Sequence, residues 1–140
     1  MSQAVEEREH ARQQAQAQLQ SIVELMTAIE SARLGGLVLY ADEWLSFDEL
    51  EERAHELPLS VLVRSAWSEP GSELQPVEYK ILLCTGGPAV RIRGDVSNHG
   101  EPTSARLEAQ DWFTPWEAQP TTSDADWALV EFASLFWFGG

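Results

Sequence analysis

The spacing of apolar residues near the start of the chain predicts a long helix over residues 1–34. One apolar stripe recurs at intervals of three and four residues: Leu19, Ile22, Met26 and Ile29. The residues before this stripe are mostly Ala, Gln and Glu, which favour helix but offer little apolar surface. We therefore expect the second half of the helix to pack on the core. The first half is expected to project into solvent, to fray or to meet a partner chain.

A second, shorter helix is predicted over residues 46–56. Ser46 followed by Glu49 at the third helical position is a capping-box pattern. The helix is expected to stop before Pro58, because the residue before a proline disfavours helical geometry.

Between residues 59 and 112 the apolar period changes to two, which is typical of half-buried strands. Turn-rich segments containing Gly, Pro and Asn separate four such runs: 60–68, 77–84, 89–96 and 104–111. The pattern therefore predicts a four-stranded antiparallel meander.

Apolar and charged residues also suggest how these strands pair. Placing Cys84 opposite Ala89 brings Ile81 to face Ile92. Placing Val96 opposite Ala105 brings Arg93 to face Glu108 on the other side of the sheet. Favourable cross-strand pairs on both faces support these registers. By this register five basic residues share the polar face of the sheet: Arg64, Lys80, Arg91, Arg93 and Arg106.

A final helix is predicted over residues 123–138, with Ser123 as N-cap and acidic residues in its first turn. Apolar residues cover most of its circumference, so we expect it to be buried on more than one side. The whole pattern predicts a single α+β domain over residues 1–140. In it the long N-terminal helix and the aromatic C-terminal helix cover the apolar face of the sheet, and the short acidic helix lies at an edge or against the polar face.

Charge adds the strongest restriction on function. The chain carries 23 acidic and 9 basic residues, a formal net charge of −14 over 140 residues. Such a balance disfavours direct binding to nucleic acid or to an anionic membrane, and it favours a protein partner with a basic surface. A single cysteine, Cys84, no signal-peptide pattern and no apolar run of about 20 residues lead us to expect a cytoplasmic protein.

Seven carboxylates crowd into the region of the second helix and are the candidate partner-binding residues. They are Asp42, Glu43, Asp48, Glu49, Glu51, Glu52 and Glu56. They either imitate the phosphates of a nucleic acid for a basic groove or form an ordinary solvated helix face. The basic sheet face is likewise open to two interpretations. It binds an anion or docks an acidic partner or the acidic helix, or it is a salt-bridged face exposed to solvent.

Two short aromatic segments, 112–116 and 136–140, raise a further choice between core and interface. Trp112, Trp116 and Trp137 are the candidate interface residues, since Trp is enriched at binding hot spots. If the two segments lie together, they form an apolar patch of the kind that marks an interface.

The sequence offers no catalytic constellation, and we expect a protein that is not an enzyme and uses no cofactor or metal. The predicted strands place Cys84 and His99 at opposite ends of a hairpin, more than about 20 Å apart. The loop 85–88 lacks the Lys-Ser/Thr of a phosphate-binding loop. His10 and His55 have no partner at metal-ligand spacing.

The run Ile81–Gly94, together with Leu107–Trp116 and the aromatic C-terminus, resembles a group of small uncharacterised proteins encoded by phages and prophages of proteobacteria. The resemblance covers roughly residues 57–140 and carries no activity or site residues. What it implies is context, because small acidic phage proteins often inhibit host machinery, as anti-CRISPR and antirestriction proteins do.

These observations lead to three hypotheses. The first is a binding protein that inhibits or modulates a host protein complex, by way of the acidic residues and in one form by nucleic-acid mimicry. The second is a structural protein that dimerises through the N-terminal helix or the aromatic C-terminus. The third is an anion or nucleic-acid binder that uses the basic sheet face.

Overall fold

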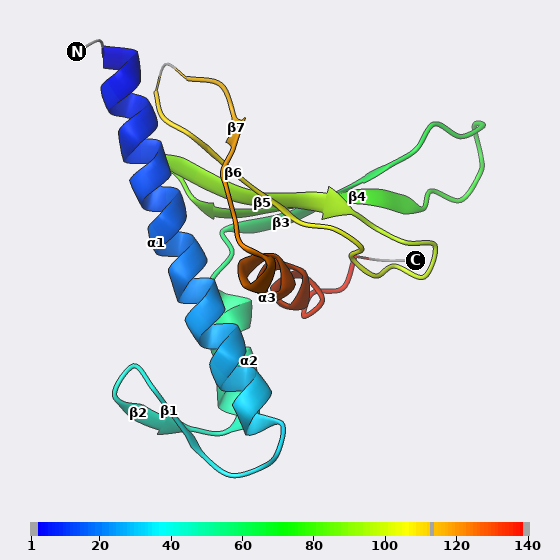
Figure 1. The fold of residues 1–140 in the computed structure, drawn as a ribbon. Coiled ribbons are helices and arrows are strands. Elements are labelled where there is room, and N and C mark those ends of the chain that lie inside the picture. Colours follow the sequence, from blue (N-terminus) through cyan, green and yellow to red (C-terminus); the bar gives the residue numbers. More distant parts are fainter. Residues whose placement is uncertain (1–2, 113, 139–140) are drawn as a thin grey trace.

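The computed structural model describes residues 3–112 and 114–138 and has an α+β fold (Figure 1). The elements in chain order are α1 (Gln3–Ala32), β1 (Val38–Tyr40), β2 (Glu43–Leu45), α2 (Phe47–Glu56), β3 (Ser60–Ser65), β4 (Pro76–Cys84), β5 (Ala89–Asp95), β6 (Arg106–Gln110), β7 (Glu117–Ala118) and α3 (Ser123–Ala133). Strands β3 to β7 form one antiparallel sheet in sequence order, and β1 and β2 form a separate hairpin. The expected four-stranded meander is thus part of a five-stranded sheet.

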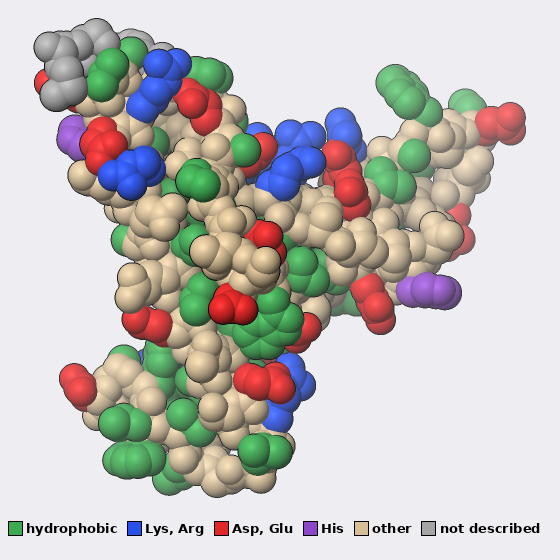
Figure 2. All heavy atoms as spheres, in the orientation of Figure 1, with side chains coloured by type: hydrophobic (Ala, Val, Ile, Leu, Met, Phe, Trp, Pro, Cys, Tyr) green, Lys and Arg blue, Asp and Glu red, His purple; other side chains and the backbone are tan. Residues whose placement is uncertain are grey.

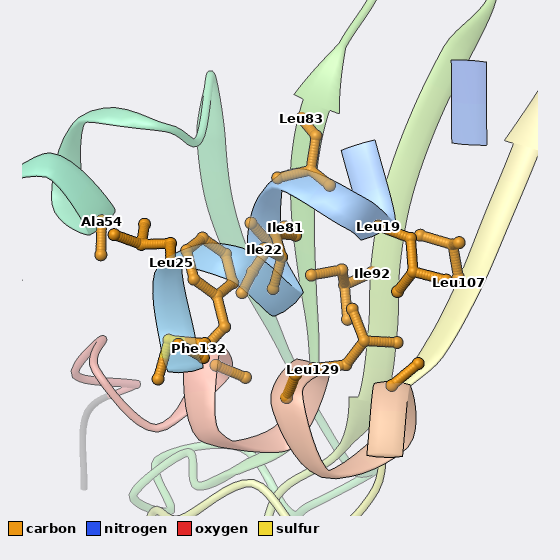
Figure 3. Close-up of a cluster of buried hydrophobic side chains, with 14 of the residues drawn as sticks. Leu19, Ile22, Leu25, Ala54, Ile81, Leu83, Ile92, Leu107, Leu129 and Phe132 are labelled. Atoms are coloured by element: carbon orange, nitrogen blue, oxygen red, sulfur yellow. The ribbon is translucent and has the colours of Figure 1, made fainter. Parts of the chain in front are cut away.

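Helices α1 and α3 pack on one face of the sheet, and the core lies between these helices and the sheet (Figure 3). The stripe predicted on α1 is fully buried, and it meets the apolar residues of the central strands, including Ile81, Ile92 and Leu107. From α3, Leu129 and Phe132 complete this cluster. Close packing of these side chains is the main stabilising contribution to the fold.

The first half of α1 is also packed against the protein. Ala11 and Ala15 are buried, and Arg8 pairs with Glu117 of β7 at 2.8 Å. From the sequence, this half of the helix was expected to bury little apolar surface. That expectation did not take into account that the small side chain of alanine lets the backbone of a helix lie close to a sheet. Residues 1 and 2 of the predicted helix lie outside the described residues.

The predicted register between β4 and β5 is confirmed over most of its length. Ile81 lies opposite Ile92, and Lys80 lies opposite Arg93. A bulge near the turn shifts the last pair, so that Cys84 lies opposite Val90 rather than Ala89.

The predicted register between β5 and β6 is wrong by two residues. Arg91, not Arg93, faces Glu108, and Arg93 faces Arg106. The connecting turn closes early, with the Ser97 amide bonded to the Glu101 carbonyl, so that Val96 pairs with Pro102. A shift of two keeps every side chain on its predicted face, which is why the hydrophobic pattern cannot detect it.

Helix α2 begins as predicted, with Ser46 as N-cap and a reciprocal capping box with Glu49. Its buried residues, Leu50 and Ala54, join the core, and it packs on α1. The imidazole of His55 makes a 2.8 Å hydrogen bond with the Leu135 carbonyl. The helix is therefore placed beside α1 and not against the polar face of the sheet.

Helix α3 is shorter than predicted, and its N-cap is Thr122 rather than Ser123. It ends at Ala133, where the Ser134 hydroxyl donates to the Glu131 carbonyl. The chain then turns so that Phe138 stacks on Tyr79 with ring centroids 4.8 Å apart. The helix buries one side only, because Trp127 is exposed to solvent.

Strand β3 also ends early, at Ser65, where a bulge interrupts its pairing with β4. The chain beyond it forms a long loop in which Trp67 is fully exposed. Among the described residues, no helix is long and apolar enough to cross a membrane.

Candidate protein-binding surface on the acidic lobe

The β1–β2 hairpin and α2 together form a projection at the C-terminal end of α1, here called the acidic lobe (residues 38–56; Figure 1). The hairpin closes through the two residues Ala41 and Asp42, whose φ angles are 50° and 64°. Two consecutive positive φ values are typical of the type I′ turn that suits the twist of paired strands. This turn places Asp42 at the exposed tip of the hairpin.

The two sides of the hairpin differ in what they contact. Leu45 is buried and Val38 packs against the core. The cross-strand partners Leu39 and Trp44 point the other way, and their exposed fractions are 55% and 65%. Figure 2 shows hydrophobic side chains gathered at this end of the molecule. An exposed Leu–Trp pair next to a two-residue turn has the character of an interface anchor.

The sequence prediction missed Leu39 and Trp44 because it missed the hairpin. The available signal was an apolar run over residues 37–40, then Ala41-Asp42, then Trp44-Leu45. An Ala-Asp turn lacks the glycine that usually marks a two-residue hairpin loop.

Helix α2 presents a carboxylate stripe on its exposed side. Asp48, Glu52 and Glu56 follow each other at intervals of four residues and are all exposed. Successive members are about 6 Å apart along the axis, at 1.5 Å per residue. They lie away from Leu50 and Ala54, which hold the opposite side in the core.

Two of the seven candidate carboxylates have structural tasks. Glu43 accepts a 2.7 Å hydrogen bond from Arg53, and this bond raises the pKa of Arg53. Glu49 accepts from the Ser46 amide at 3.2 Å and so closes the capping box. Within the described part of the chain, the other five have no basic group within 4.0 Å: Asp42, Asp48, Glu51, Glu52 and Glu56.

The acidic lobe therefore combines charge with apolar surface. Seven carboxylates against the single Arg53 leave six net negative charges within residues 42–56. Negative charge around an apolar anchor attracts a basic surface over a distance and leaves the anchor free to be buried on contact.

The candidate tryptophans do not form one patch. Trp112 is exposed and follows β6 at the end of the sheet where Gln110 pairs with Ala89. Trp137 is 84% exposed and precedes Phe138, which stacks on Tyr79 at the Gly94 end. The two ends of β5 are about 20 Å apart at 3.3 Å per residue, so the expectation of a joint patch is wrong. Phe113, Gly139 and Gly140 lie outside the described residues.

Trp116 is only partly exposed because its ring covers Arg91, with the guanidinium carbon 4.0 Å from the ring centroid. Arg91 also donates a 2.7 Å hydrogen bond to Glu108, and both of these side chains are 13% exposed. Trp116 therefore belongs to a packed cation–π and ion-pair unit, and it is not a free anchor.

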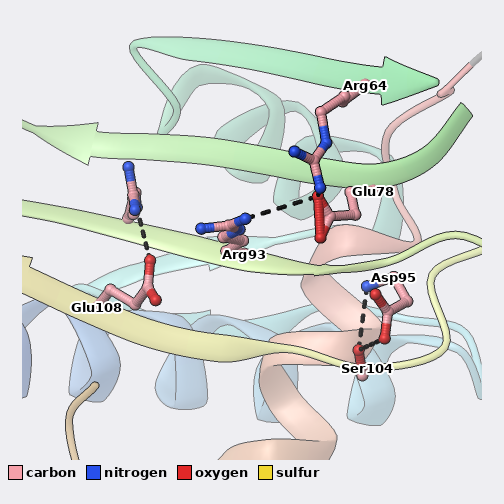
Figure 4. Close-up of polar contacts among 7 residues, drawn as sticks. Arg64, Glu78, Arg93, Asp95, Ser104 and Glu108 are labelled. Atoms are coloured by element: carbon pink, nitrogen blue, oxygen red, sulfur yellow. Dashed lines mark hydrogen bonds and ion pairs between the residues drawn. The ribbon is translucent and has the colours of Figure 1, made fainter. Parts of the chain in front are cut away.

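The polar face of the sheet carries the five basic residues that the sequence placed there, as the strand registers show. Glu78 pairs with Arg64 and lies 3.6 Å from Arg93 (Figure 4). The acidic helix α2 does not cover this face, because α1 and α3 pack on the opposite face of the sheet and α2 packs on α1. The five basic residues of the polar face therefore have only the carboxylates of the same face as partners, and these neutralise them only in part.

The residues considered for catalysis are not arranged for it. Burial raises the pKa of the Cys84 thiol, which disfavours the reactive thiolate, and its sulfur lies 3.7 Å from the Pro88 carbonyl oxygen. His99 lies in the turn after β5, where the register places it at the other end of the hairpin. Within residues 3–112 and 114–138, no group of three potential metal ligands comes together.

Comparison with known proteins gives this chain no relative. No protein-family model matches it, and no curated protein and no solved structure matches it either.

Proposed function

We propose that the protein is a binding protein whose acidic lobe inhibits or modulates a protein complex by occupying a basic surface. The observation that carries this proposal is the exposed Leu39–Trp44 pair on a lobe with six net negative charges. The partner has a basic rim around a shallow apolar depression that accepts the indole. In the phage context suggested by the sequence resemblance, a nucleic-acid-handling complex of the host has surfaces of this kind.

The geometry favours recognition of a protein surface over close imitation of nucleic acid. The stripe Asp48–Glu52–Glu56 has about one charge per 6 Å, whereas one strand of DNA has one per roughly 3.4 Å of axis. A helix with about half that charge density is a weak copy of a phosphate array. The apolar anchor supplies contact energy that charge alone would not provide.

The experiment is a capture from proteobacterial lysate with the full chain as bait, washed through a salt gradient and read by mass spectrometry. One variant reverses charge at Glu51, Glu52 and Glu56, and a second is Trp44→Ala. A matched control reverses charge at Glu69, Glu73 and Glu101, which are exposed residues of loops outside the acidic lobe. We expect one complex to be retained by the wild type and the control and to be lost by both lobe variants.

Retention of that complex by the charge-reversed lobe would overturn the proposal. Equal loss in the control variant would also contradict it, because general acidity would then explain the binding. Circular dichroism of each variant checks that α2 remains folded.

Self-assembly is the second candidate function, and one observation favours it. The indole of Trp137 is 84% exposed beside the buried Phe138. Dimerisation through the N-terminal helix was expected because its first half offered no core of its own. Ala11 and Ala15 of that half are buried within the chain, so this reason no longer applies. The native mass of the full chain and of Trp137→Ala tests the aromatic C-terminus, and a monomer in both would exclude this candidate.

A further inference from the structure

Three cations lie directly opposite one another in a row across the polar face of the sheet. Lys80 on β4 pairs with Arg93 on β5, and Arg93 pairs with Arg106 on β6. Neighbouring strands are about 4.8 Å apart, so the row extends over about 10 Å. Like charges that face each other across strands are destabilising. In a chain of net charge −14, their alignment calls for an explanation.

Ion pairs among the described residues neutralise this row only in small part. Among the residues that the structure describes, no carboxylate lies within 4.0 Å of Lys80 or Arg106. Arg93 has only a 3.6 Å contact with Glu78, which also pairs with Arg64. The four basic residues outside this face, by contrast, each have an acidic partner: Arg8, Arg12, Arg33 and Arg53.

The surroundings of the row leave it accessible. A shallow hollow on this face is lined by residues that include Leu62, Lys80 and Arg93. Arg106 is exposed, and the side chain of Arg93 is 33% exposed. Figure 2 shows Lys and Arg side chains gathered over the sheet, well separated from the acidic lobe.

We propose that the row Lys80–Arg93–Arg106 is a binding site for a compact oligophosphate. A monovalent anion engages one of these cations, whereas a short chain of phosphates spreads several charges over a comparable length and engages all three. The carboxylates of Glu78 and Asp95 on one side and Glu108 on the other bound the row. They repel a longer polyanion, as does the net charge of the protein, so a compact ligand fits better than a nucleic-acid strand.

The test uses the full chain and inorganic tripolyphosphate as the probe, in calorimetric titrations at about 20 mM salt, where screening is weak. We expect saturable binding by the wild type with one ligand per chain. Lys80→Gln and Arg106→Gln should each weaken it about ten- to a hundredfold, which corresponds to one lost charge-assisted hydrogen bond. Arg12→Gln changes the net charge equally on α1, away from the row, and should leave the affinity unchanged.

A second readout separates ligand binding from folding. Because the substitutions remove repulsion between facing cations, Lys80→Gln and Arg106→Gln should unfold at the same or a higher temperature than the wild type when no ligand is present. Tripolyphosphate should raise the unfolding temperature of the wild type more than that of either variant.

Three results would overturn the proposal. The first is no saturable binding by the wild type. The second is an equal loss of affinity in Arg12→Gln, which would indicate general attraction. The third is tighter binding of a single-stranded oligonucleotide than of tripolyphosphate, which would assign the face to nucleic acid instead. None of these results bears on the acidic lobe, whose function is tested by different variants.

Discussion

The hydroxyl of Tyr79 donates a 2.6 Å hydrogen bond to the carbonyl oxygen of Ser104, across the intervening strand β5. The residue on β5 that lies between them is Gly94, opposite Tyr79. A Cβ atom at position 94 would lie 2.0 Å from the Ser104 oxygen and 2.8 Å from the Tyr79 ring. The bond across the sheet therefore requires glycine at this position.

Gly94→Ala is accordingly expected to destabilise the protein by about 3 kcal/mol, because backbone and a buried ring must both move. Urea unfolding followed by circular dichroism measures this loss. Gly87→Ala is a suitable control, since a Cβ there meets no atom within 4 Å. A Gly94→Ala protein as stable as this control would contradict the packing described.

Alkaline pH tests the surroundings of the two tyrosines. Burial raises the pKa of Tyr79 far above its usual value of 10, and the nearby charge of Asp95 adds to the effect. Burial also raises the pKa of Tyr40, beside Glu24. A raised pKa means that the folded state favours the neutral phenol. This stabilisation is fully present below pH 10 and is lost as pH rises through the folded value.

We therefore expect a phenolate absorbance titration of the native protein to show no ionisation centred at pH 10. The ionisation of Tyr79 should coincide with alkaline unfolding and should be absent in Tyr79→Phe. In strong urea both tyrosines should titrate at their usual pKa. Reversible ionisation of both near pH 10 in the folded protein would contradict the structure.

The start of α3 offers a matched pair of substitutions. The Thr122 hydroxyl accepts a hydrogen bond from the Ala125 amide at 3.2 Å, whereas Ser123 is the first helical residue. Thr122→Ala should cost about 1 kcal/mol of unfolding free energy, the usual value of an N-cap. Ser123→Ala should be close to neutral. A larger loss of stability in Ser123→Ala than in Thr122→Ala would contradict this assignment and identify Ser123, the residue that the sequence predicts, as the N-cap.

The Arg91–Glu108 pair should contribute more than an exposed ion pair, because both side chains are largely buried beneath Trp116. Glu108→Gln should therefore lower stability by about 1–3 kcal/mol by leaving the guanidinium without a charged partner. The intrinsic fluorescence should change as well, since Trp116 lies on that guanidinium. Glu101→Gln in the exposed turn is the control, expected within about 0.5 kcal/mol of wild type.

Sequence reasoning predicted those parts of the fold whose structure is determined by one local rule. The helical stripe of Leu19 and Ile22 and the capping box at Ser46 have strong periodic or positional signals. So do the faces of the central strands, because alternation alone assigns residues such as Ile81 and Lys80 to opposite sides.

The parts that were missed depend on contacts between distant segments. The pairing of β5 with β6 depends on the turn at Ser97 and on the Tyr79–Ser104 bond, neither of which leaves a trace in the hydrophobic pattern. The end of α3 depends on Phe138 reaching Tyr79. In the candidate site the carboxylates were visible in the sequence, but the Leu39–Trp44 anchor required the hairpin to be known.

The acidic lobe and the polar face of the sheet have a joint consequence, because they place net charges of opposite sign on separate parts of the molecule. The lobe has a net charge of −6, whereas the sheet face has five basic residues against three carboxylates, Glu78, Asp95 and Glu108. In the electric field of a highly charged partner, such a molecule is oriented before the two proteins come into contact. Added salt should therefore slow association more than it speeds dissociation.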